Sequence, residues 1–365
     1  MATTFKTLLN NDIASTRTLL HEAVPITGTI VSGTYSDSNI KNFSHGMFQS
    51  VYDYPYLSSS ANHIFDITMG YSTNAGLSSS AATQNSKKIN IYNQMAQVLM
   101  GHDADGNIRE FDRDGDLLGT TTDSMRECFF LNFSRLLVKD EIKKGSFQLT
   151  VATASAYSHG FDGAGELTLY DTDAQNSYRS NSPAGEYGLL YTASTFTSGD
   201  HTEQAVGQVF YQAGVIVLTS SIFGANPDDS DSEVEVSNYW GSKEGDDNDT
   251  YSTIKKAMYS GSISGSADGL RNRLKNVQFN NTTELNSTIY FCRANHNEFN
   301  YSSNPTYVTG SKMRVKNVTS DSPVSYITSV GLYSADNELL AVAKLSEPLK
   351  KTPENELTLR VRLDY

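Results

Sequence analysis

GQVFYQAGVIVLTSSIF, residues 207–223, is the most continuous apolar run in the chain. A strand covered on one face alternates apolar and polar residues, whereas a strand covered on both faces is apolar throughout. This run therefore predicts a central strand that is buried on both sides. SPAGEYGLLYTAS, at 182–194, is also typical of a strand, so we expect a sheet in this part of the chain.

Further strands are expected toward the C-terminal end. They are rich in β-branched and aromatic residues, and several alternate apolar with polar positions. The segments are ELNSTIYFCRA (284–294), SKMRVKNVTS (311–320), VSYITSVGLY (324–333), ELLAVAKL (338–345) and ELTLRVRLDY (356–365).

Helical spacing is found in fewer places. KKINIYNQMAQVLMG (87–101) repeats apolar residues at steps of three and four and closes on Gly101, which predicts a helix. SADGLRNRLKNVQF (266–279) predicts a short helix, and residues 4–24 also have helix-like spacing. MRECFFLNFSRLL (125–137) has helical spacing, but its aromatic content leaves a strand open.

These segments together predict an α+β, β-dominated fold with antiparallel, sandwich-like sheets, a few helices and long loops. We expect two parts, a mixed α/β N-terminal region at 1–150 and a β-rich region at 151–365. Residues 225–250, which carry many acids and almost no apolar residues, are expected to form an acidic surface loop.

The net charge and the amino-acid composition bear on which kinds of partner the protein binds. The 365-residue chain carries a net charge of −13, which disfavours nucleic acid and the anionic face of a membrane as partners. The 21 Tyr and 16 Phe residues supply material for burial and for protein–protein contact. Cys128 and Cys292 lie in apolar surroundings, so we expect two buried, reduced thiols and assembly in a cytoplasm, with no signal peptide.

The sequence contains no strong catalytic or cofactor motif. The seven histidines have no metal-binding spacing, and there is no nucleophile elbow, phosphate-binding loop or dinucleotide fingerprint. We therefore expect no enzymatic activity, no cofactor and no dedicated metal site.

One aspartate-rich stretch resembles the sequence of a calcium-binding loop. Its acids are Asp103, Asp105, Asp112, Asp114 and Asp116. The glycines stand two positions too early for an EF-hand and the closing Glu is missing. Two Asp-Gly hairpin turns are the preferred interpretation, with adventitious calcium as the alternative.

An aromatic loop is the first candidate interface. NHNEFNYSSNPTYVTGSK (295–312) combines turn residues with Phe299, Tyr301 and Tyr307. Such a loop fits docking of a neighbouring subunit, sugar binding, or a well-packed long loop.

A hairpin is the second candidate interface. In VGLYSADNELLAVAKLSEPL (330–349) an apolar segment, the polar turn 334–337 and a second apolar segment follow one another. Asp and Asn tolerate the left-handed backbone that tight hairpins need, so the stretch predicts strand, turn and strand. Tyr333 and Asp336 are its candidate contact residues.

The hairpin also carries a resemblance to a known family. Gly-Leu-Tyr-x-Ala-Asp-x-x-Leu-Leu-Ala-Val-Ala, beginning at Gly331, resembles a GLYDADGxLLAVA-type hairpin of tail-fibre and baseplate-associated proteins of tailed bacteriophages. It departs from that pattern at Ser334 and Asn337. The last 80 residues or so are similar to virion structural proteins of contractile-tailed phages, including cyanophages. Residues 93–112 and 132–147 show a weaker similarity of the same kind.

The resemblance implies a structural role in the virion. We expect a homo-oligomeric protein of the tail or baseplate that docks other virion proteins through hairpins, terminal strands and aromatic loops. A head or neck protein is an alternative of the same class. A receptor protein that binds or depolymerises host glycans is an alternative of another class, although such proteins usually show long repeats and none is found.

Overall fold

The computed structural model of the protein describes most of the chain. The described residues are 5–26, 36–117, 123–153, 165–172, 174–195, 204–223, 254–300, 308–309, 312–313 and 324–365. The expected acidic loop at 225–250 and most of the expected strand at 311–320 lie outside them.

Contacts between residues divide the chain into two units. Unit 1 consists of Met1–Leu20 and Glu284–Tyr365, and unit 2 of His21–Thr283. The sequence-based division at residue 150 differs from this one, because unit 1 takes both ends of the chain. The unit boundaries fall inside two long strands, β1 (Ile13–Ile26) and β15 (Leu274–Ala294).

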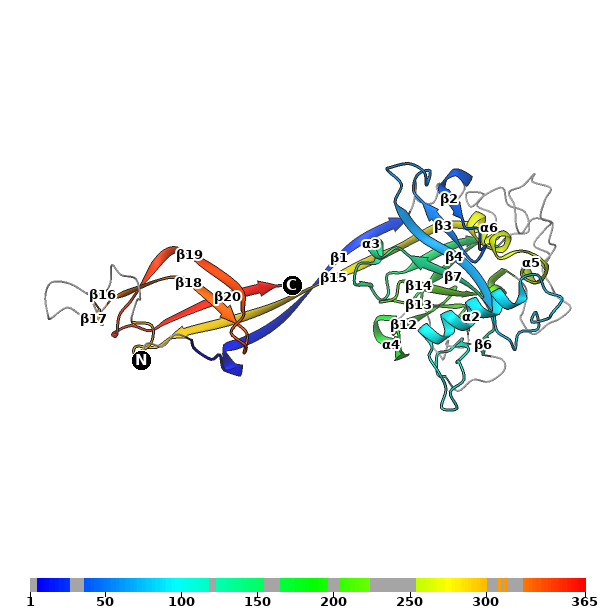
Figure 1. Ribbon diagram of the computed structural model, residues 1–365. Coiled ribbons are helices and arrows are strands. Elements are labelled where there is room, and N and C mark those ends of the chain that lie inside the picture. Colours follow the sequence, from blue (N-terminus) through cyan, green and yellow to red (C-terminus); the bar gives the residue numbers. More distant parts are fainter. Residues whose placement is uncertain are drawn as a thin grey trace. The chain divides into compact units, whose positions relative to one another are not determined.

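Unit 2 is built on an antiparallel sheet of eight strands (Figure 1). In spatial order the strands are β11 (Arg179–Ser182), β12 (Gly185–Leu190), β13 (Gly207–Phe210), β14 (Val215–Thr219), β7 (Glu127–Phe133), β4 (His63–Tyr71), β3 (Gln49–Tyr52) and β2 (Ile40–Asn42). The predicted fold class, β-dominated α+β with antiparallel sheets, is confirmed.

The quoted run 207–223 supplies two neighbouring strands of this sheet rather than one. Residues 211–214 form a turn, and Gly214 has a φ of +67°, a conformation that favours glycine. All five residues of β14 are buried, and β14 lies between β13 and β7. The central, doubly buried strand is therefore confirmed, but it is only five residues long.

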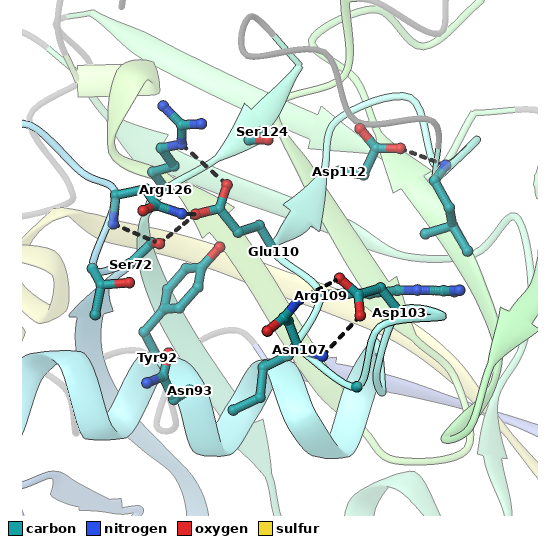
Figure 2. A pocket seen from close by; sticks show the side chains of 15 residues that line it. Ser72, Tyr92, Asn93, Asp103, Asn107, Arg109, Glu110, Asp112, Ser124 and Arg126 are labelled. Atoms are coloured by element: carbon teal, nitrogen blue, oxygen red, sulfur yellow. Dashed lines mark hydrogen bonds and ion pairs between the residues drawn. The ribbon is translucent and has the colours of Figure 1, made fainter.

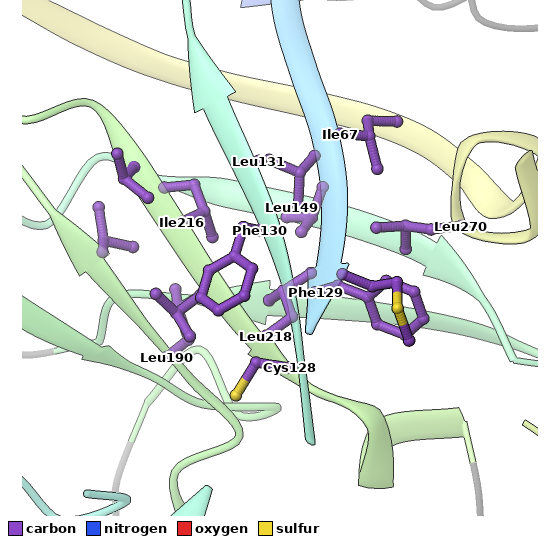
Figure 3. Packing of buried hydrophobic residues seen from close by; sticks show 14 of the residues in the cluster. Ile67, Cys128, Phe129, Phe130, Leu131, Leu149, Leu190, Ile216, Leu218 and Leu270 are labelled. Atoms are coloured by element: carbon purple, nitrogen blue, oxygen red, sulfur yellow. The ribbon is translucent and has the colours of Figure 1, made fainter. Parts of the chain in front are cut away.

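The core fills both faces of this sheet. Phe129 and Phe130 occupy successive positions of β7, so they point to opposite faces, as Figure 3 shows. On one face the ring of Phe130 lies edge-to-face against Tyr92 and tilted against Phe111. On the other face Phe129 lies edge-to-face against Phe223, at a ring-centroid distance of 6.2 Å.

A second group of strands in unit 2 includes the first part of β15. β9 (Gln148–Ala152) pairs with β15 and with β10 (Glu166–Tyr170), and β8 (Glu141–Ile142) pairs with β15 at Asn281–Thr282. Phe279 of β15 and Phe147 both contact Phe133 of β7, so this group packs on the large sheet. A two-stranded ladder completes the strands of unit 2: β5 (Phe111–Asp112) with β6 (Ser124–Met125).

The described α-helices are short apart from one. They are α2 (Asn85–Leu99), α3 (Arg135–Val138), α4 (Ala174–Ser177), α5 (Ile254–Ser260) and α6 (Ile263–Arg273). Three 3₁₀ turns are also described, at Asn10–Asp12, Asp37–Asn39 and Ser220–Phe223. The helix predicted at 87–101 is confirmed as α2.

Helix α2 lies directly on β4 (Figure 1). A Cβ atom on Gly70 would lie 2.6 Å from the Lys88 carbonyl oxygen and 2.8 Å from the Tyr92 nitrogen, so only glycine permits this approach. The buried Lys88 side chain donates to the carbonyl oxygens of Met258 (2.6 Å) and Gly261 (2.8 Å), which ties α2 to the end of α5. Burial lowers the pKa of Lys88 to about 8.

The described part of unit 1 consists mainly of strands and contains no α-helix. β20 (Leu357–Asp364) pairs antiparallel with Ser287–Ala294 of β15. β18 (Ser325–Tyr333) and β19 (Leu339–Lys351) form a separate hairpin, and β16 (Val308–Thr309) pairs with β17 (Lys312–Met313). The strands predicted at 284–294, 324–333, 338–345 and 356–365 are all confirmed.

Three sequence-based expectations need correction. The helix expected at 4–24 is wrong: Ile13–Ile26 is a strand, because pairing with β15 outweighs the helix-like spacing. The helix expected at 266–279 ends at Arg273, and β15 begins at once. In 125–137 the aromatic positions form β7, and only the last residues belong to α3.

Replacing Gly70 tests the close contact between α2 and β4. Gly70→Ala places a methyl group against the backbone of α2, which should lower the free energy of unfolding by about 1–3 kcal/mol. Gly76→Ala is the matched control, because no atom outside Gly76 and its two chain neighbours lies within 4 Å of the added Cβ. Chemical denaturation of both variants measures the difference, and equal loss in the two would contradict the packing argument.

Candidate functional site

The aromatic loop predicted as an interface is described only in part. Tyr301 and Tyr307 lie outside the described residues. Phe299 is partly buried, has a φ of +54° and accepts a hydrogen bond at its carbonyl oxygen from the Ser325 hydroxyl, at 2.7 Å. Phe299 is thus held by its backbone at the start of β18.

The hairpin predicted at 330–349 is confirmed in position and geometry. Asn337 has a φ of +61° and donates from its backbone nitrogen to the Ser334 carbonyl oxygen at 3.1 Å, so Asn serves the turn as expected. Asp336 lies exposed in this turn. Tyr333 ends β18, eight residues beyond Ser325, so it lies about 26 Å from the Phe299 end of the strand. Phe299 and Tyr333 therefore lie near opposite ends of β18.

An exposed apolar group surrounds Tyr333, and we call it the hairpin patch. Tyr333 is 46% exposed and meets the ring of Phe5 edge-to-face at 5.2 Å. Both residues share the patch with Leu339, Leu340 and Val342, each more than half exposed. Sequence reasoning missed Phe5, because nothing in its local pattern indicates that it reaches a hairpin more than 300 residues away.

Unit 1 buries very little apolar surface. Among the described residues, the buried apolar side chains of unit 1 are Ile289, Ala294 and Val361, whereas the large hydrophobic core lies wholly in unit 2. Of the eighteen large apolar side chains that are exposed in the described part of the chain, twelve belong to unit 1. A two-stranded hairpin alone is marginally stable in water, and β18 and β19 pair with no other described strand, so their exposed apolar side chains are available to a covering surface.

Charge is also distributed unequally. Unit 1 contains 11 Lys and Arg residues against 10 Asp and Glu, a net charge of +1. Unit 2 holds the remaining 17 basic and 31 acidic residues, a net charge of −14. Two copies of unit 1 can therefore meet with little repulsion, whereas two copies of unit 2 repel each other.

Unit 2 contains a polar cavity of about 810 Å³ (Figure 2). Its wall includes residues from the ends of β4 and β5, one face of α2 and the loop 103–110. The charged lining residues are Asp103, Arg109, Glu110, Asp112 and Arg126. The cavity offers hydrogen-bond donors and acceptors to a polar ligand, and little apolar surface.

Glu110 accepts hydrogen bonds from three side chains in this cavity. Its carboxylate accepts from Arg126 Nε at 3.1 Å, from Asn74 Nδ2 at 3.0 Å and from the Ser72 hydroxyl (Figure 2). Burial acts to raise the pKa of Glu110, but these three donors outweigh it and the pKa is lowered. Glu110 is therefore held as an anion, which suits hydrogen bonding to a ligand better than proton donation.

Of the two predicted Asp-Gly hairpin turns, the first is confirmed, because His102 and Ile108 form an antiparallel bridge around it, whereas the second Asp-Gly pair lies in a bend that follows β5. Gly106 and Gly115 have φ values of +85° and +72°. In the first turn the exposed Asp103 carboxylate accepts from the backbone nitrogens of Asp105 and Asn107, at 3.0 and 2.8 Å, which lowers its pKa. Hydrogen bonds within the turn thus account for the lowered pKa of Asp103 without a metal ion.

The second Asp-Gly segment differs because Asp112 is buried. Asp112 is 4% exposed, and its Oδ2 accepts from the Leu117 backbone nitrogen at 2.7 Å. Burial raises its pKa to about 6, and the neighbouring Asp114 and Asp116 add to the shift. The structure brings these three acids together, and the Asp-x-Asp-x-Asp spacing was the only signal of this in the sequence.

The two cysteines are both free thiols, as expected. Cys128 is fully buried, and burial raises its pKa well above the usual value. Cys292 is only partly buried, so the expectation of two buried thiols holds for Cys128 alone.

No protein-family model, curated protein or solved structure matches this chain. Among the described residues, none of the helices has the length and apolar character needed to cross a membrane. Any function must therefore be argued from the residues and their geometry.

A second buried acid lies away from the cavity, at the end of β10. Asp171 is 2% exposed and accepts from the backbone nitrogens of Gly145 (2.7 Å) and Phe147 (2.9 Å) and from the Tyr211 hydroxyl (3.1 Å). Burial raises the pKa of Asp171 to about 7, against the effect of these donors. Asp171 thus links the loop before β9 to the end of β10.

The raised pKa of Asp171 predicts a pH-dependent stability. The unfolded chain releases this proton near pH 4 and the folded protein near pH 7, so the folded state holds more protons in between. The contribution of Asp171 to the free energy of unfolding should therefore fall as pH rises from 4 to 7, by up to about 4 kcal/mol, and stay constant above.

Asp171→Asn removes this titration while it keeps the size of the side chain. The difference in unfolding free energy between the unmodified chain and the variant, measured by denaturation from pH 4 to 9, should decline up to about pH 7 and then level off. A difference that is flat with pH, or that rises, would show that Asp171 is ionised in the folded protein throughout.

Proposed function

We propose that the chain is a structural protein of a tailed-phage virion, of the tail or baseplate, that self-associates through unit 1. The observation that carries this proposal is the exposure of the hairpin patch on a unit with almost no core of its own. The stretch that resembles virion structural proteins, roughly the last 80 residues, falls within unit 1.

Further copies of the same chain are the proposed cover for the hairpin patch. Most oligomers are symmetric and contain one kind of chain, and their interfaces resemble a domain core that has been divided. Unit 1 is almost neutral, so copies can approach there in spite of the acidic unit 2. Docking of other virion proteins would use surfaces that remain exposed after self-association.

A charged substitution in the hairpin patch tests self-association. Leu340 and Val342 are 67% and 54% exposed in the single chain, so Leu340→Asp with Val342→Asp should leave the subunit folded. Burying these carboxylates between copies would be costly, so light scattering should show the 40.0 kDa monomer in place of a defined oligomer.

The matched control is Leu136→Asp, because Leu136 is 82% exposed and lies in unit 2. This variant should keep the mass of the unmodified protein. A monodisperse 40.0 kDa species for the unmodified chain, or an oligomer that survives the double substitution, would contradict assembly through the hairpin patch.

Glycan binding is a second candidate, and the polar cavity of unit 2 favours it. An anionic Glu110 beside Asn74 and Arg126 offers acceptors and donors of the kind that bind sugar hydroxyl groups. A glycan array and a reducing-sugar assay, each with Glu110→Gln as the comparison, separate this candidate from a purely structural role.

A further inference from the structure

The second Asp-Gly segment of unit 2 gathers three carboxylates at alternate positions. One carboxylate oxygen from each of Asp112, Asp114 and Asp116 lies within 4.8 Å of the others. Two oxygens that bind one calcium ion at 2.3–2.6 Å lie at most about 5 Å apart. The spacing of the three side chains is therefore compatible with a shared cation.

A separate observation concerns the hydrogen bonding of the Asp112 carboxylate. Its Oδ1 atom is buried and accepts from no backbone, amide, hydroxyl or basic donor in the described part of the chain, and the carboxyl group of Asp114 lies within hydrogen-bonding reach of the Asp112 side chain. Asp112 and Asp114 form no described ion pair with Lys or Arg. The nearby Arg179 donates instead to the Asp114 backbone carbonyl oxygen, at 3.0 Å. A buried carboxylate oxygen without a donor is costly unless a proton or a cation occupies its vicinity.

We propose that Asp112, Asp114 and Asp116 bind a calcium ion. Hard oxygen ligands select calcium or magnesium over softer metals, and calcium tolerates the irregular geometry that three carboxylates and added water molecules provide. The loop is not an EF-hand, since Gly115 stands fourth and the closing Glu is missing. We expect a dissociation constant of about 10⁻⁴ to 10⁻³ M.

The proposed ion has a structural consequence for the cavity. Asp112 and Leu117 both line it, and they are joined by the Asp112 Oδ2 hydrogen bond. A cation held by Asp112 would fix this side of the cavity wall. The inference stands apart from self-association, because every proposed ligand lies in unit 2.

Calcium titration of the full-length chain tests the site. The protein is stripped with a chelator and titrated with calcium chloride by calorimetry, and its melting temperature is measured with and without calcium. Asp114→Asn and Asp116→Asn keep side-chain size but remove charge from the exposed part of the site, so each should weaken binding at least tenfold. The matched control, Asp105→Asn, removes one charge from the exposed first turn and should bind calcium as the unmodified chain does.

The outcomes are distinguishable from failure to fold or to assemble. Circular dichroism and light scattering should give the same secondary structure and mass for all variants. Absence of binding to the unmodified chain at about 10 mM calcium would overturn the proposal. So would equal weakening in Asp105→Asn, because that result would indicate diffuse attraction to an acidic surface.

Discussion

The antiparallel register of β7 is the constraint on which the rest of unit 2 depends. Phe130 stands opposite Thr68 of β4 and Val217 of β14, and Cys128 stands opposite Gly70. A slip of one residue would move every side chain of β7 to the other face. The register therefore sets the position of Gly70 in the sheet, and α2 packs at that position. It also places Arg126, whose carbonyl oxygen accepts from the Ser72 nitrogen at 2.8 Å, beside the cavity.

Much of the fold could be predicted from the sequence because burial leaves a local pattern. The apolar run at 215–219 reflects a strand that is buried on both faces. The spacing of apolar residues in 87–101 reflects a helix that is buried on one side. Residues 13–26 could not be predicted in this way. Their strand is decided by pairing with β15, more than 250 positions away, and the side chains of residues 13–23 are largely exposed, so no periodicity indicates the partner.

Less of the candidate site could be predicted. The hairpin turn was evident because Asn337 and its neighbours carry their own conformational preference. The cavity was not, because Ser72, Asn74, Glu110 and Arg126 are ordinary polar residues that become a group only when β4, β5 and β7 align. The acids of the second Asp-Gly segment were noticed, but their sequence does not reveal that Asp112 alone is buried.

If copies of the chain associate through unit 1, as proposed, the unequal charge of the two units affects the ionic conditions in which they do so. Each added copy brings a further −14 of unit 2 charge into one particle, and this repulsion acts over the Debye length, about 8 Å at physiological ionic strength and about 30 Å at 0.01 M. Apolar contact between copies does not weaken with added salt. In the proposed assembly, ionic strength would act as a control: dilute buffer would favour separate subunits, and salt would permit association.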